Sequence, residues 1–237
     1  MLAARAVISG CTLGIFGALA ERPDTAAGLA ERLDLDPLGV ETLLYALRSL
    51  DYLEPAGEDG ELAPAPEARR LLVPTSPESV AAFLGAQNAH HWTTLARLDE
   101  VMRTGEPVGW HDVAPGDPLW DAYIRGLYES SRHDHDDNAA VVPVSDARAM
   151  VDVAGGHGAF AMAMCRRHAR LHATVLDLPA SVAVGRRIVA EQGFADRVAF
   201  REGDALAAEL GDGLDVVSCF NLVHHLSVGD DVRLFER

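Results

Sequence analysis

Hydrophobic positions change their spacing once along the chain, close to Ala149. Before that point they recur every three or four residues, which is the period of amphipathic helices. After it, short apolar runs alternate with helical stretches, which is typical of a sheet with helices packed against it. The spacing therefore predicts a mostly helical N-terminal part followed by an α/β domain.

The helical part begins with two short helices and a hairpin. Apolar stripes at residues 29–33 and 40–47 predict the helices. Thr25 is placed to cap the first, and Asp36 followed by Pro37 is placed to open the second. The text "YLEPAGEDGELAP" then predicts two extended pieces around a Gly-rich turn. Together these elements form a winged-helix pattern.

Further helices are predicted before the change in spacing, one over residues 78–104 and one over residues 117–132. Two polar clusters accompany them, His90 with His91, and residues 133–138. Metal ligands must converge in space, whereas neighbours in a helix point in different directions. We therefore predict no metal site and interpret residues 133–138 as a solvated helix end.

Four apolar strands are predicted from Ala149 onward, in the texts "AMVDV", "HATVLDLP", "RVAFREGDAL" and "LDVVSCFNLVHH". Because helical stretches separate them, we predict the parallel strands of a doubly wound sheet. Ligands of such sheets bind at the carboxyl ends of the strands. The candidate site is therefore expected where these strands end, with His224 at the end of the fourth.

Charge excludes several classes of partner. The chain has 20 basic residues, all of them Arg, against 36 acidic ones, and its formal net charge is -16. Such a surface repels phosphate backbones and anionic membranes. Residues 21–62 contain three Arg and eleven acidic residues. We therefore expect no nucleic acid partner and no membrane partner, and we expect the winged-helix pattern to serve packing or dimerisation.

Cysteine usage and the N-terminus bear on the compartment. Cys11, Cys165 and Cys219 are far apart, so neither a disulfide framework nor a zinc cluster is indicated. The first 21 residues imitate a signal peptide, yet the apolar run before Cys11 is short and Leu13 and Phe16 fall at helical spacing. We expect a cytoplasmic protein.

The Gly-rich turn after the first strand is the strongest chemical signal. Gly155, Gly156 and Gly158 allow the backbone to approach a ligand, and the helix that follows presents free N–H groups. Asp177 ends the second strand about 20 residues later, where a carboxylate can accept hydrogen bonds from ribose hydroxyls. The same turn fits the dinucleotide fingerprint. The turn alone leaves both a nicotinamide cofactor and S-adenosylmethionine open.

The chain as a whole resembles a known family. The texts "LGIFGALAE", "AAGLAERLDLDP", "LLYALRSLDYLEP", "VDVAGGHGAF", "VLDLP", "GDAL" and "NLVHHLS" are together similar to the O-methyltransferases of plant and bacterial secondary metabolism. The resemblance implies an N-terminal winged-helix dimerisation domain and a Rossmann-like methyltransferase domain. It implies residues 1–75 for dimerisation, 76–145 as a helical linker lining the acceptor pocket, and 146–237 for cofactor binding.

The resemblance also implies an activity and a set of site residues. The activity is methyl transfer from S-adenosylmethionine to a small aromatic or polyketide hydroxyl, as in antibiotic biosynthesis, by a homodimer. Asp177 would hold the ribose, Asp204 the adenine, and His224 would be the general base. The full set of implied cofactor residues is Gly155, Gly156, Gly158, Asp177, Leu178, Asp204 and Ala205.

The sequence departs from the family pattern at three points. Ala154 stands at the usual first Gly of the turn, and His225 and Leu226 stand at a usual Asp and Trp. The family pattern continues past the base with a helix and three more strands, whereas this chain ends at Arg237, so we expect a partial sheet of about four strands. Two alternatives stay open, a catalytically incomplete dimerising scaffold and a nicotinamide-dependent oxidoreductase.

Overall fold

The computed structural model describes residues 2–57, 59–106 and 114–237. The chain divides into two compact units, Met1–Val108 and Gly109–Arg237. Each has its own buried apolar cluster, so each is described by itself.

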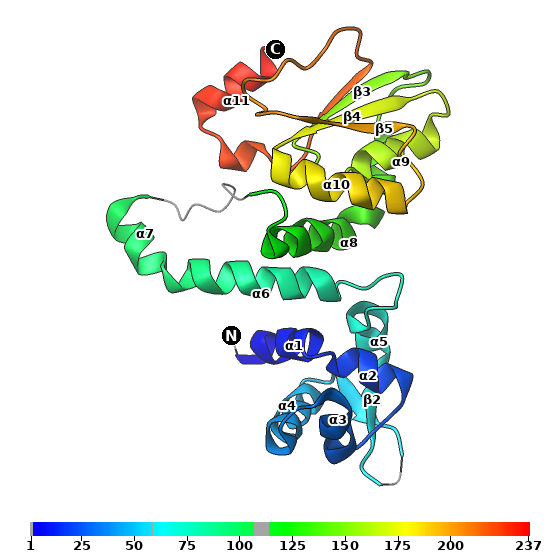
Figure 1. Cartoon of the computed structure of the whole chain (residues 1–237), viewed down its shortest axis with the longest axis vertical. Coiled ribbons are helices and arrows are strands. Elements are labelled where there is room, and N and C mark those ends of the chain that lie inside the picture. The colour runs from blue at the N-terminus through cyan, green and yellow to red at the C-terminus, as the bar shows by residue number, and fades with distance from the viewer. Residues whose placement is uncertain (1, 58, 107–113) are drawn as a thin grey trace. The chain divides into compact units, whose positions relative to one another are not determined.

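The first unit is helical apart from one small hairpin (Figure 1). Strands β1 (Leu53–Pro55) and β2 (Leu62–Pro64) pair antiparallel. Phe16, Leu29 and Leu47 are fully buried in its core. The helices are α1 (Leu2–Thr12), α2 (Ile15–Glu21), α3 (Ala26–Leu33), α4 (Pro37–Ser49), α5 (Pro66–Leu72), α6 (Ala81–Ala96) and α7 (Leu98–Thr104).

Side-chain caps begin α3 and α4 as predicted. The Thr25 hydroxyl accepts a hydrogen bond from the Gly28 N–H at 3.2 Å. The Asp36 carboxylate accepts one from the Gly39 N–H at 2.8 Å, and Pro37 occupies the first turn of α4. These bonds satisfy N–H groups that a helix start otherwise leaves without partners. The sequence therefore predicted both starts correctly.

The prediction of one helix over residues 78–104 was wrong. α6 ends at Ala96 and α7 begins at Leu98. Arg97 between them has φ -102° and ψ 8°, outside helical geometry, and its guanidinium binds Glu100 in the first turn of α7 at 2.9 and 2.8 Å. Apolar spacing does not register a break of one residue, because both helices keep the same period. The side chains of His90 and His91 lie outside the described residues.

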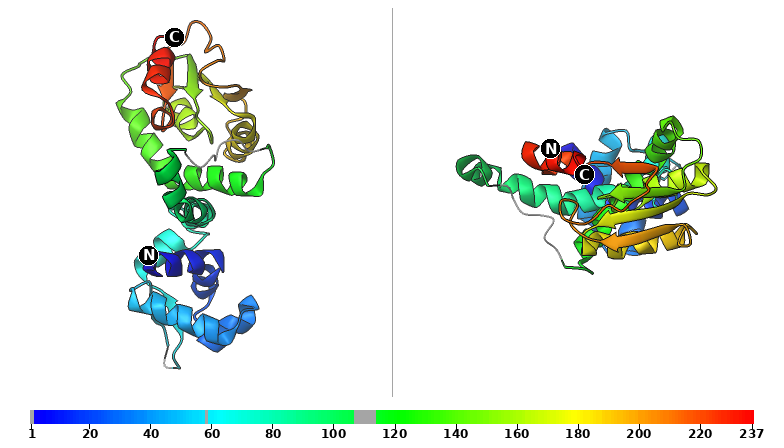
Figure 2. Two further views of the ribbon diagram at one scale, coloured as in Figure 1. Left: turned by 90° about the vertical axis from the view of Figure 1, so that its left-hand side faces the viewer. Right: turned by 90° about the horizontal axis from the view of Figure 1, so that it is seen from above.

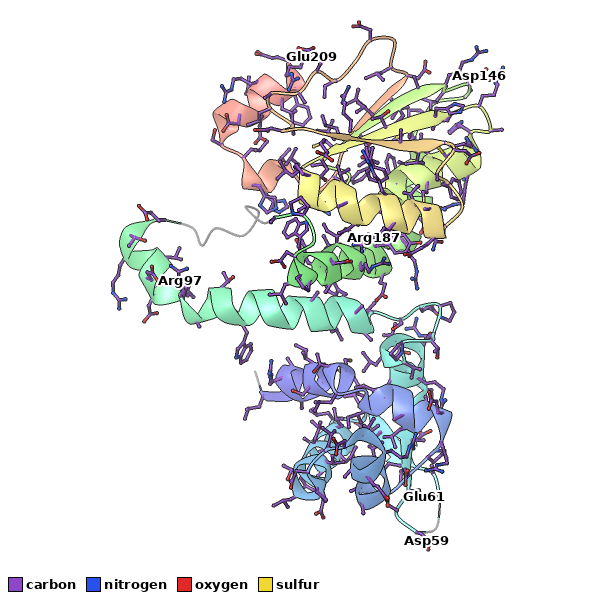
Figure 3. All side chains as sticks on the ribbon, viewed as in Figure 1. Asp59, Glu61, Arg97, Asp146, Arg187 and Glu209 are labelled. Carbon is purple, nitrogen blue, oxygen red and sulfur yellow. The ribbon has the colours of Figure 1, made fainter. Side chains whose placement is uncertain are left out.

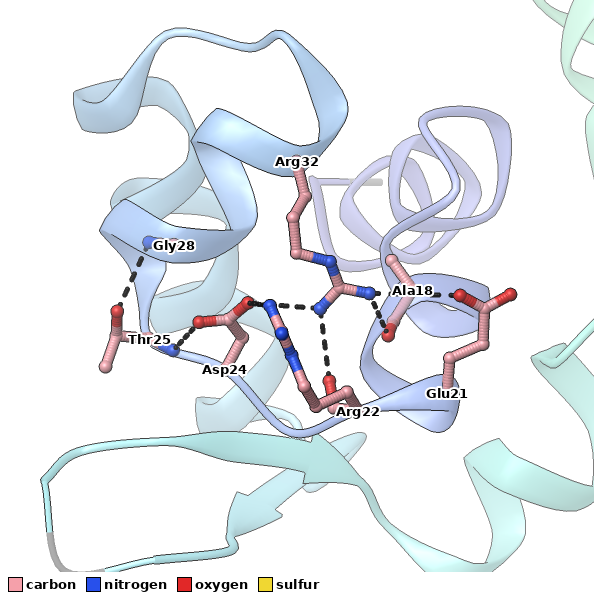
Figure 4. Close-up of polar contacts among 7 residues, drawn as sticks. All are labelled: Ala18, Glu21, Arg22, Asp24, Thr25, Gly28 and Arg32. Carbon is pink, nitrogen blue, oxygen red and sulfur yellow. Dashed lines mark hydrogen bonds and ion pairs between the residues drawn. The ribbon is translucent and has the colours of Figure 1, made fainter.

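Arg32 connects three segments of the first unit (Figure 4). Its guanidinium donates to the carbonyl oxygens of Ala18 at 2.8 Å and Arg22 at 3.2 Å, and to the Asp24 carboxylate at 3.1 Å. Asp24 in turn exchanges two backbone hydrogen bonds with Leu62 of β2. The Arg32 guanidinium, more than any other group, holds the pKa of Asp24 below its usual value. One side chain thus joins α2, α3 and the hairpin.

We expect Arg32→Met to lower the free energy of unfolding by about 1–3 kcal/mol, because it leaves partly buried acceptors without their donor. Urea unfolding near neutral pH measures the loss. The lowered pKa of Asp24 means that its contribution is present above the usual Asp pKa and is lost as the pH falls through the lowered value. The difference from the wild type should therefore shrink in acid.

Arg70→Met is the matched control for Arg32→Met. Arg70 also carries two ion pairs, with Glu67 and Glu78, but all three side chains are well exposed. Exposed pairs contribute little to stability, so the control should lower the free energy of unfolding clearly less than Arg32→Met does. Equal losses in the two variants would contradict the assigned role of Arg32.

The second unit carries a four-stranded parallel sheet in the order β5-β4-β3-β6 (Figure 1 and Figure 2). The sheet confirms the prediction of parallel strands alternating with helices. The elements are α8 (Pro118–Val141), β3 (Ala149–Val153), α9 (Ala159–Arg167), β4 (His172–Asp177), α10 (Pro179–Glu191), β5 (Val198–Glu202), β6 (Val216–Cys219), a 3-10 turn (Val223–His225) and α11 (Val228–Phe235).

The two faces of the sheet are covered by different helices. Met150 of β3 is buried in a cluster with residues of α8, α9 and α10. Val151 and Val153 are buried on the other face, with Leu234 of α11. Successive side chains of a strand point to opposite faces, and burial of both faces explains why β3 is apolar except at Asp152. Arg187 of α10 (labelled in Figure 3) pairs with Asp121 of α8.

The prediction of a solvated helix end at residues 133–138 was wrong in part. α8 continues to Val141, and the side chain of His135 is only 7% exposed. His135 packs against the rings of Phe160 and Phe220, which come from α9 and the segment after β6. A run of polar residues predicts a solvent-exposed segment, but the position of each residue around the helix axis decides whether its side chain faces the core.

Within the described residues, no single helix is long and apolar enough to cross a membrane. The bent pair α1 and α2, which meet at 58°, passes that test only when joined.

Candidate active site

The turn between β3 and α9 has a backbone that favours glycine. Ala154, Gly156 and Gly158 have φ of 56°, 48° and 73°, in the left-handed region. Gly155 is required for a different reason, since a Cβ there would lie 2.6 Å from Cγ of Asp152. Left-handed backbone is strained for a residue with a side chain, so Ala154 stores strain at the start of the turn.

Asp177 holds this turn in place from the neighbouring strand. Its Oδ2 accepts a hydrogen bond from the Gly156 N–H at 2.8 Å, and its Oδ1 accepts one from the Leu178 N–H at 2.7 Å. Its carbonyl oxygen accepts from the Gly203 N–H at 2.9 Å. The segments that follow β3, β4 and β5 therefore meet at this one residue. The sequence spacing had brought the turn and Asp177 together, and the structure agrees.

Gly185 is a site residue that the sequence reasoning missed. It lies in the middle of α10, and a Cβ there would overlap the carbonyl oxygen of Gly156 and approach the Phe200 ring to 2.5 Å. α10 can therefore approach the Gly-rich turn only because position 185 has no side chain. The available signal was a glycine inside an otherwise regular helix, which is unfavourable without a packing reason.

We expect Gly185→Ala to destabilise the protein by about 1–3 kcal/mol, because the new methyl group overpacks the contact between α10 and the turn. Thermal unfolding measures the change. Gly229→Ala in α11 is the control, since its Cβ would meet nothing nearer than 3.8 Å. Alanine is the better helix former, so the control should be neutral or stabilising. Gain of stability in both variants would show that α10 does not need the close approach.

The other predicted cofactor residues lie beside Asp177. Asp204 is exposed, and its Oδ1 accepts a hydrogen bond from the Leu206 N–H at 2.8 Å, which shapes the turn after β5. Ala205 packs against the apolar cluster on the α11 face of the sheet. Leu178, 38% exposed, immediately precedes α10. All three follow strand ends at the same edge of the sheet.

His224 lies beyond the sheet. β6 ends at Cys219, and the chain then passes through Asn221, whose φ is 54°, into the 3-10 turn that contains His224. The prediction that the fourth strand runs to His224 was therefore wrong, because the left-handed residue ends the extended backbone. The rings of His224 and His225 are exposed, with centroids 3.9 Å apart. The turn follows the same edge of the sheet as Asp177.

His157 anchors the Gly-rich turn to two helices. Its Nδ1 accepts a hydrogen bond from the Ala159 N–H at 3.1 Å, so its proton is on Nε2, which lies 3.4 Å from the Ser131 hydroxyl of α8. Burial lowers the pKa of His157 to about 3 and also lowers that of His135. Both rings are therefore neutral at pH 7, and neither was identified from the sequence.

Asp152 is a buried acid in the middle of this site. Its side chain is 1% exposed, and the Ser218 hydroxyl of β6 donates to its Oδ1 at 2.5 Å. Burial, with a smaller contribution from the charge of Asp177, raises the pKa of Asp152 to about 7. The sequence carried a signal, an acidic residue inside the apolar run "AMVDV", but the spacing of apolar residues alone does not single it out.

The geometry suits a ligand that carries a ribose. A left-handed Gly turn leads into a helix start, and a carboxylate from the next strand is fixed beside it. In the part of the chain that the structure describes, no three His, Cys, Asp or Glu side chains come together as metal ligands would. Dinucleotides and S-adenosylmethionine both fit these contacts.

Residues 109–237 match the family model of the O-methyltransferase domain. The chain belongs to this family. The match covers the whole second unit, including the turn, Asp177, Asp204 and His224. Membership confirms the resemblance seen in the sequence motifs.

Several curated relatives come from Streptomyces. The mitomycin biosynthesis 6-O-methyltransferase of Streptomyces lavendulae is 29% identical over 99% of this chain and 69% of its own length. The tetracenomycin polyketide synthesis 8-O-methyl transferase of Streptomyces glaucescens is 28% identical over 98% and 70%. The aclacinomycin 10-hydroxylase of Streptomyces purpurascens is 30% identical over 81% and 54%. The chain thus spans between about half and 70% of the length of these relatives.

Solved structures share the fold. A mitomycin 7-O-methyltransferase superposes with a TM-score of 0.83 at 28% identity, over 100% of this chain and 72% of that one. A human N-acetylserotonin methyltransferase in complex with SAM superposes with a TM-score of 0.86 at 21% identity, over 99% and 71%.

Proposed function

We propose that this protein is an S-adenosylmethionine-dependent O-methyltransferase that acts on a small aromatic or polyketide hydroxyl in secondary metabolism. The observation that carries the proposal is the hydrogen bond between the Gly156 N–H and the Asp177 carboxylate, in a chain of the O-methyltransferase family. The names of the mitomycin and tetracenomycin relatives support the class of acceptor.

The proposed cofactor site uses the edge where β3, β4 and β5 end. Gly155, Gly156 and Gly158 approach the ligand through their backbone, and Asp177 accepts hydrogen bonds from the ribose hydroxyls. Asp204, which follows Gly203 and its bond to the Asp177 carbonyl oxygen, binds the adenine amino group. Leu178 and Ala205 supply apolar contacts on either side of the nucleoside.

The chemistry asks little of the protein beyond alignment and removal of one proton. When bound, the cofactor supplies an electrophilic methyl group on a positively charged sulfur. The enzyme positions the acceptor oxygen in line with that group. His224 takes the proton of the acceptor hydroxyl as the carbon–oxygen bond forms. Its place on an exposed turn leaves it accessible to an acceptor.

The cofactor assignment is tested by calorimetric titration with S-adenosylhomocysteine. We expect saturable binding to the wild type and at least about tenfold weaker binding to Asp177→Asn, because an amide presents a donor where a carboxylate accepts. Asp212→Asn, at an exposed loop position, should bind normally. A folded wild type that binds a nicotinamide dinucleotide in preference would instead favour the oxidoreductase alternative.

The base is tested by methyl transfer from labelled cofactor to a panel of phenolic and polyketide acceptors. We expect His224→Ala to lower kcat by about 10²–10⁴-fold and to leave S-adenosylhomocysteine affinity unchanged, because only the proton acceptor is removed. His225→Ala is the matched control and should keep most of the activity. The reverse result, with activity lost only in His225→Ala, would move the role to the neighbouring residue.

The first unit has a proposed role in assembly. We assign residues 1–75 to a winged-helix dimerisation domain, 76–145 to a helical linker that lines the acceptor pocket, and 146–237 to cofactor binding. The adjacent helices α3 and α4 with the β1–β2 hairpin support the winged-helix assignment. Leu38 and Tyr45, which are 70% and 75% exposed on α4, offer an apolar surface to a second copy.

A second candidate comes from the relative named as a hydroxylase. A chain with that activity would give no labelled product from any acceptor. The dimerising scaffold would likewise form dimers without turnover.

A further inference from the structure

We propose that Asp152 is a specificity-determining residue that makes the cofactor site prefer a positively charged sulfonium ligand over the neutral thioether left after methyl transfer. The proposal rests on the proposed function. Asp152 acts through its charge from beneath the Gly-rich turn, whereas Asp177 binds the ligand directly.

The position of Asp152 supports this role. It is the next-to-last residue of β3, and its carboxyl group lies so close to Gly155 that a Cβ at that position would be 2.6 Å from Cγ of Asp152. The Ser218 hydroxyl binds Oδ1. The carboxyl group therefore lies against the backbone of the turn that we propose to hold the cofactor.

Among the described residues, no cation shifts the pKa of Asp152. The titratable groups that interact with it are Asp177 on β4 and Cys219 on β6. None of the ion pairs among the described residues includes Asp152. His135 of α8 and His157 of the Gly-rich turn have lowered pKa values, so both imidazoles are neutral at pH 7. Asp152 and Asp177 are thus two neighbouring acids near the edge where β3 and β4 end.

Burial and the neighbouring acid raise the pKa of Asp152 to about 7. Without a bound ligand, its carboxyl group is therefore partly protonated near neutral pH. A positive charge that enters the site favours the carboxylate, and Asp152 then releases its proton to solvent. During the reaction the sulfur–methyl bond breaks and its electron pair stays on sulfur, which becomes neutral. The acceptor proton goes to His224, and Asp152 takes a proton back from solvent.

This coupling predicts that the affinity for S-adenosylmethionine depends on pH, whereas the affinity for S-adenosylhomocysteine lacks this dependence. At about pH 8 Asp152 is ionised in the empty site and attracts the sulfonium without losing a proton, whereas at about pH 6 proton release opposes binding. The thioether gains no such attraction. The ratio of the dissociation constants, S-adenosylhomocysteine over S-adenosylmethionine, should therefore rise about fivefold between these pH values if the sulfonium lowers the pKa of Asp152 by about one unit. The amino acid part is common to both ligands and cancels in the ratio.

Calorimetric titration of the two ligands tests the proposal. In the wild type and in the Asp212→Asn control the ratio should rise with pH, and in Asp152→Asn it should be constant. Ser218→Ala keeps the carboxyl group but removes the bond that favours its charged form, so the rise should move to higher pH. This variant preserves the test if Asp152→Asn does not fold. A wild-type ratio that is independent of pH would overturn the proposal.

The outcomes separate this inference from the proposed function. Binding of neither ligand by the folded wild type would refute the cofactor assignment itself. Binding of both with the same ratio at every pH would refute only the role of Asp152. Unfolding without ligand gives an independent check, since the raised pKa predicts that wild-type stability falls from about pH 4 to pH 7 relative to Asp152→Asn.

Discussion

The hydrogen bond from the Gly156 N–H to the Asp177 carboxylate is the constraint on which the candidate site depends. It connects the left-handed turn after β3 to the end of β4. The Gly203 N–H, which donates to the Asp177 carbonyl oxygen, connects the end of β5 to the same residue. Because the strands are parallel, all three ends lie at one edge of the sheet. The turn then needs space on its other side, which α10 leaves at Gly185. The Asp177 carboxylate thus constrains the backbone of the Gly-rich turn and, through that turn, the packing of α10.

The same arrangement explains why an acid is buried at position 152. An isolated buried carboxylate is unfavourable, and the raised pKa of Asp152 shows that the fold favours its neutral form. The Ser218 hydroxyl offsets part of that penalty, and it ties β3 to β6 through their side chains as well as their backbones. A hydrocarbon side chain would avoid that penalty, but it would leave Asp177 without a second carboxyl group beside the turn. The site therefore carries a local loss of stability where a cationic ligand would compensate it.

Much of this fold was predictable because its signals are local. Thr25 and Asp36 begin helices through bonds to residues three positions away, and Asp177 follows its turn at a spacing set by one strand–helix–strand unit. The failures share another cause, since each depends on a contact distant in sequence or on one residue's backbone. His135 is buried because it meets Phe220, 85 positions later, and Arg97 and Asn221 end their elements by single changes of dihedral angle. Periodicity averages over such residues, so it cannot detect them.

The two halves of the proposed chemistry differ in how firmly the fold holds them. Asp177 is fixed by two hydrogen bonds to its side chain and one to its carbonyl oxygen. His224 lies on an exposed turn that a left-handed residue directs away from the strand, so its place relative to the sheet is less constrained by the strand pairing. In the proposed function, the sheet would fix the cofactor site, while the segment after β6 would carry the base that meets the acceptor. A difference confined to the segment after β6 would permit relatives at similar identity to carry names as different as O-methyltransferase and hydroxylase.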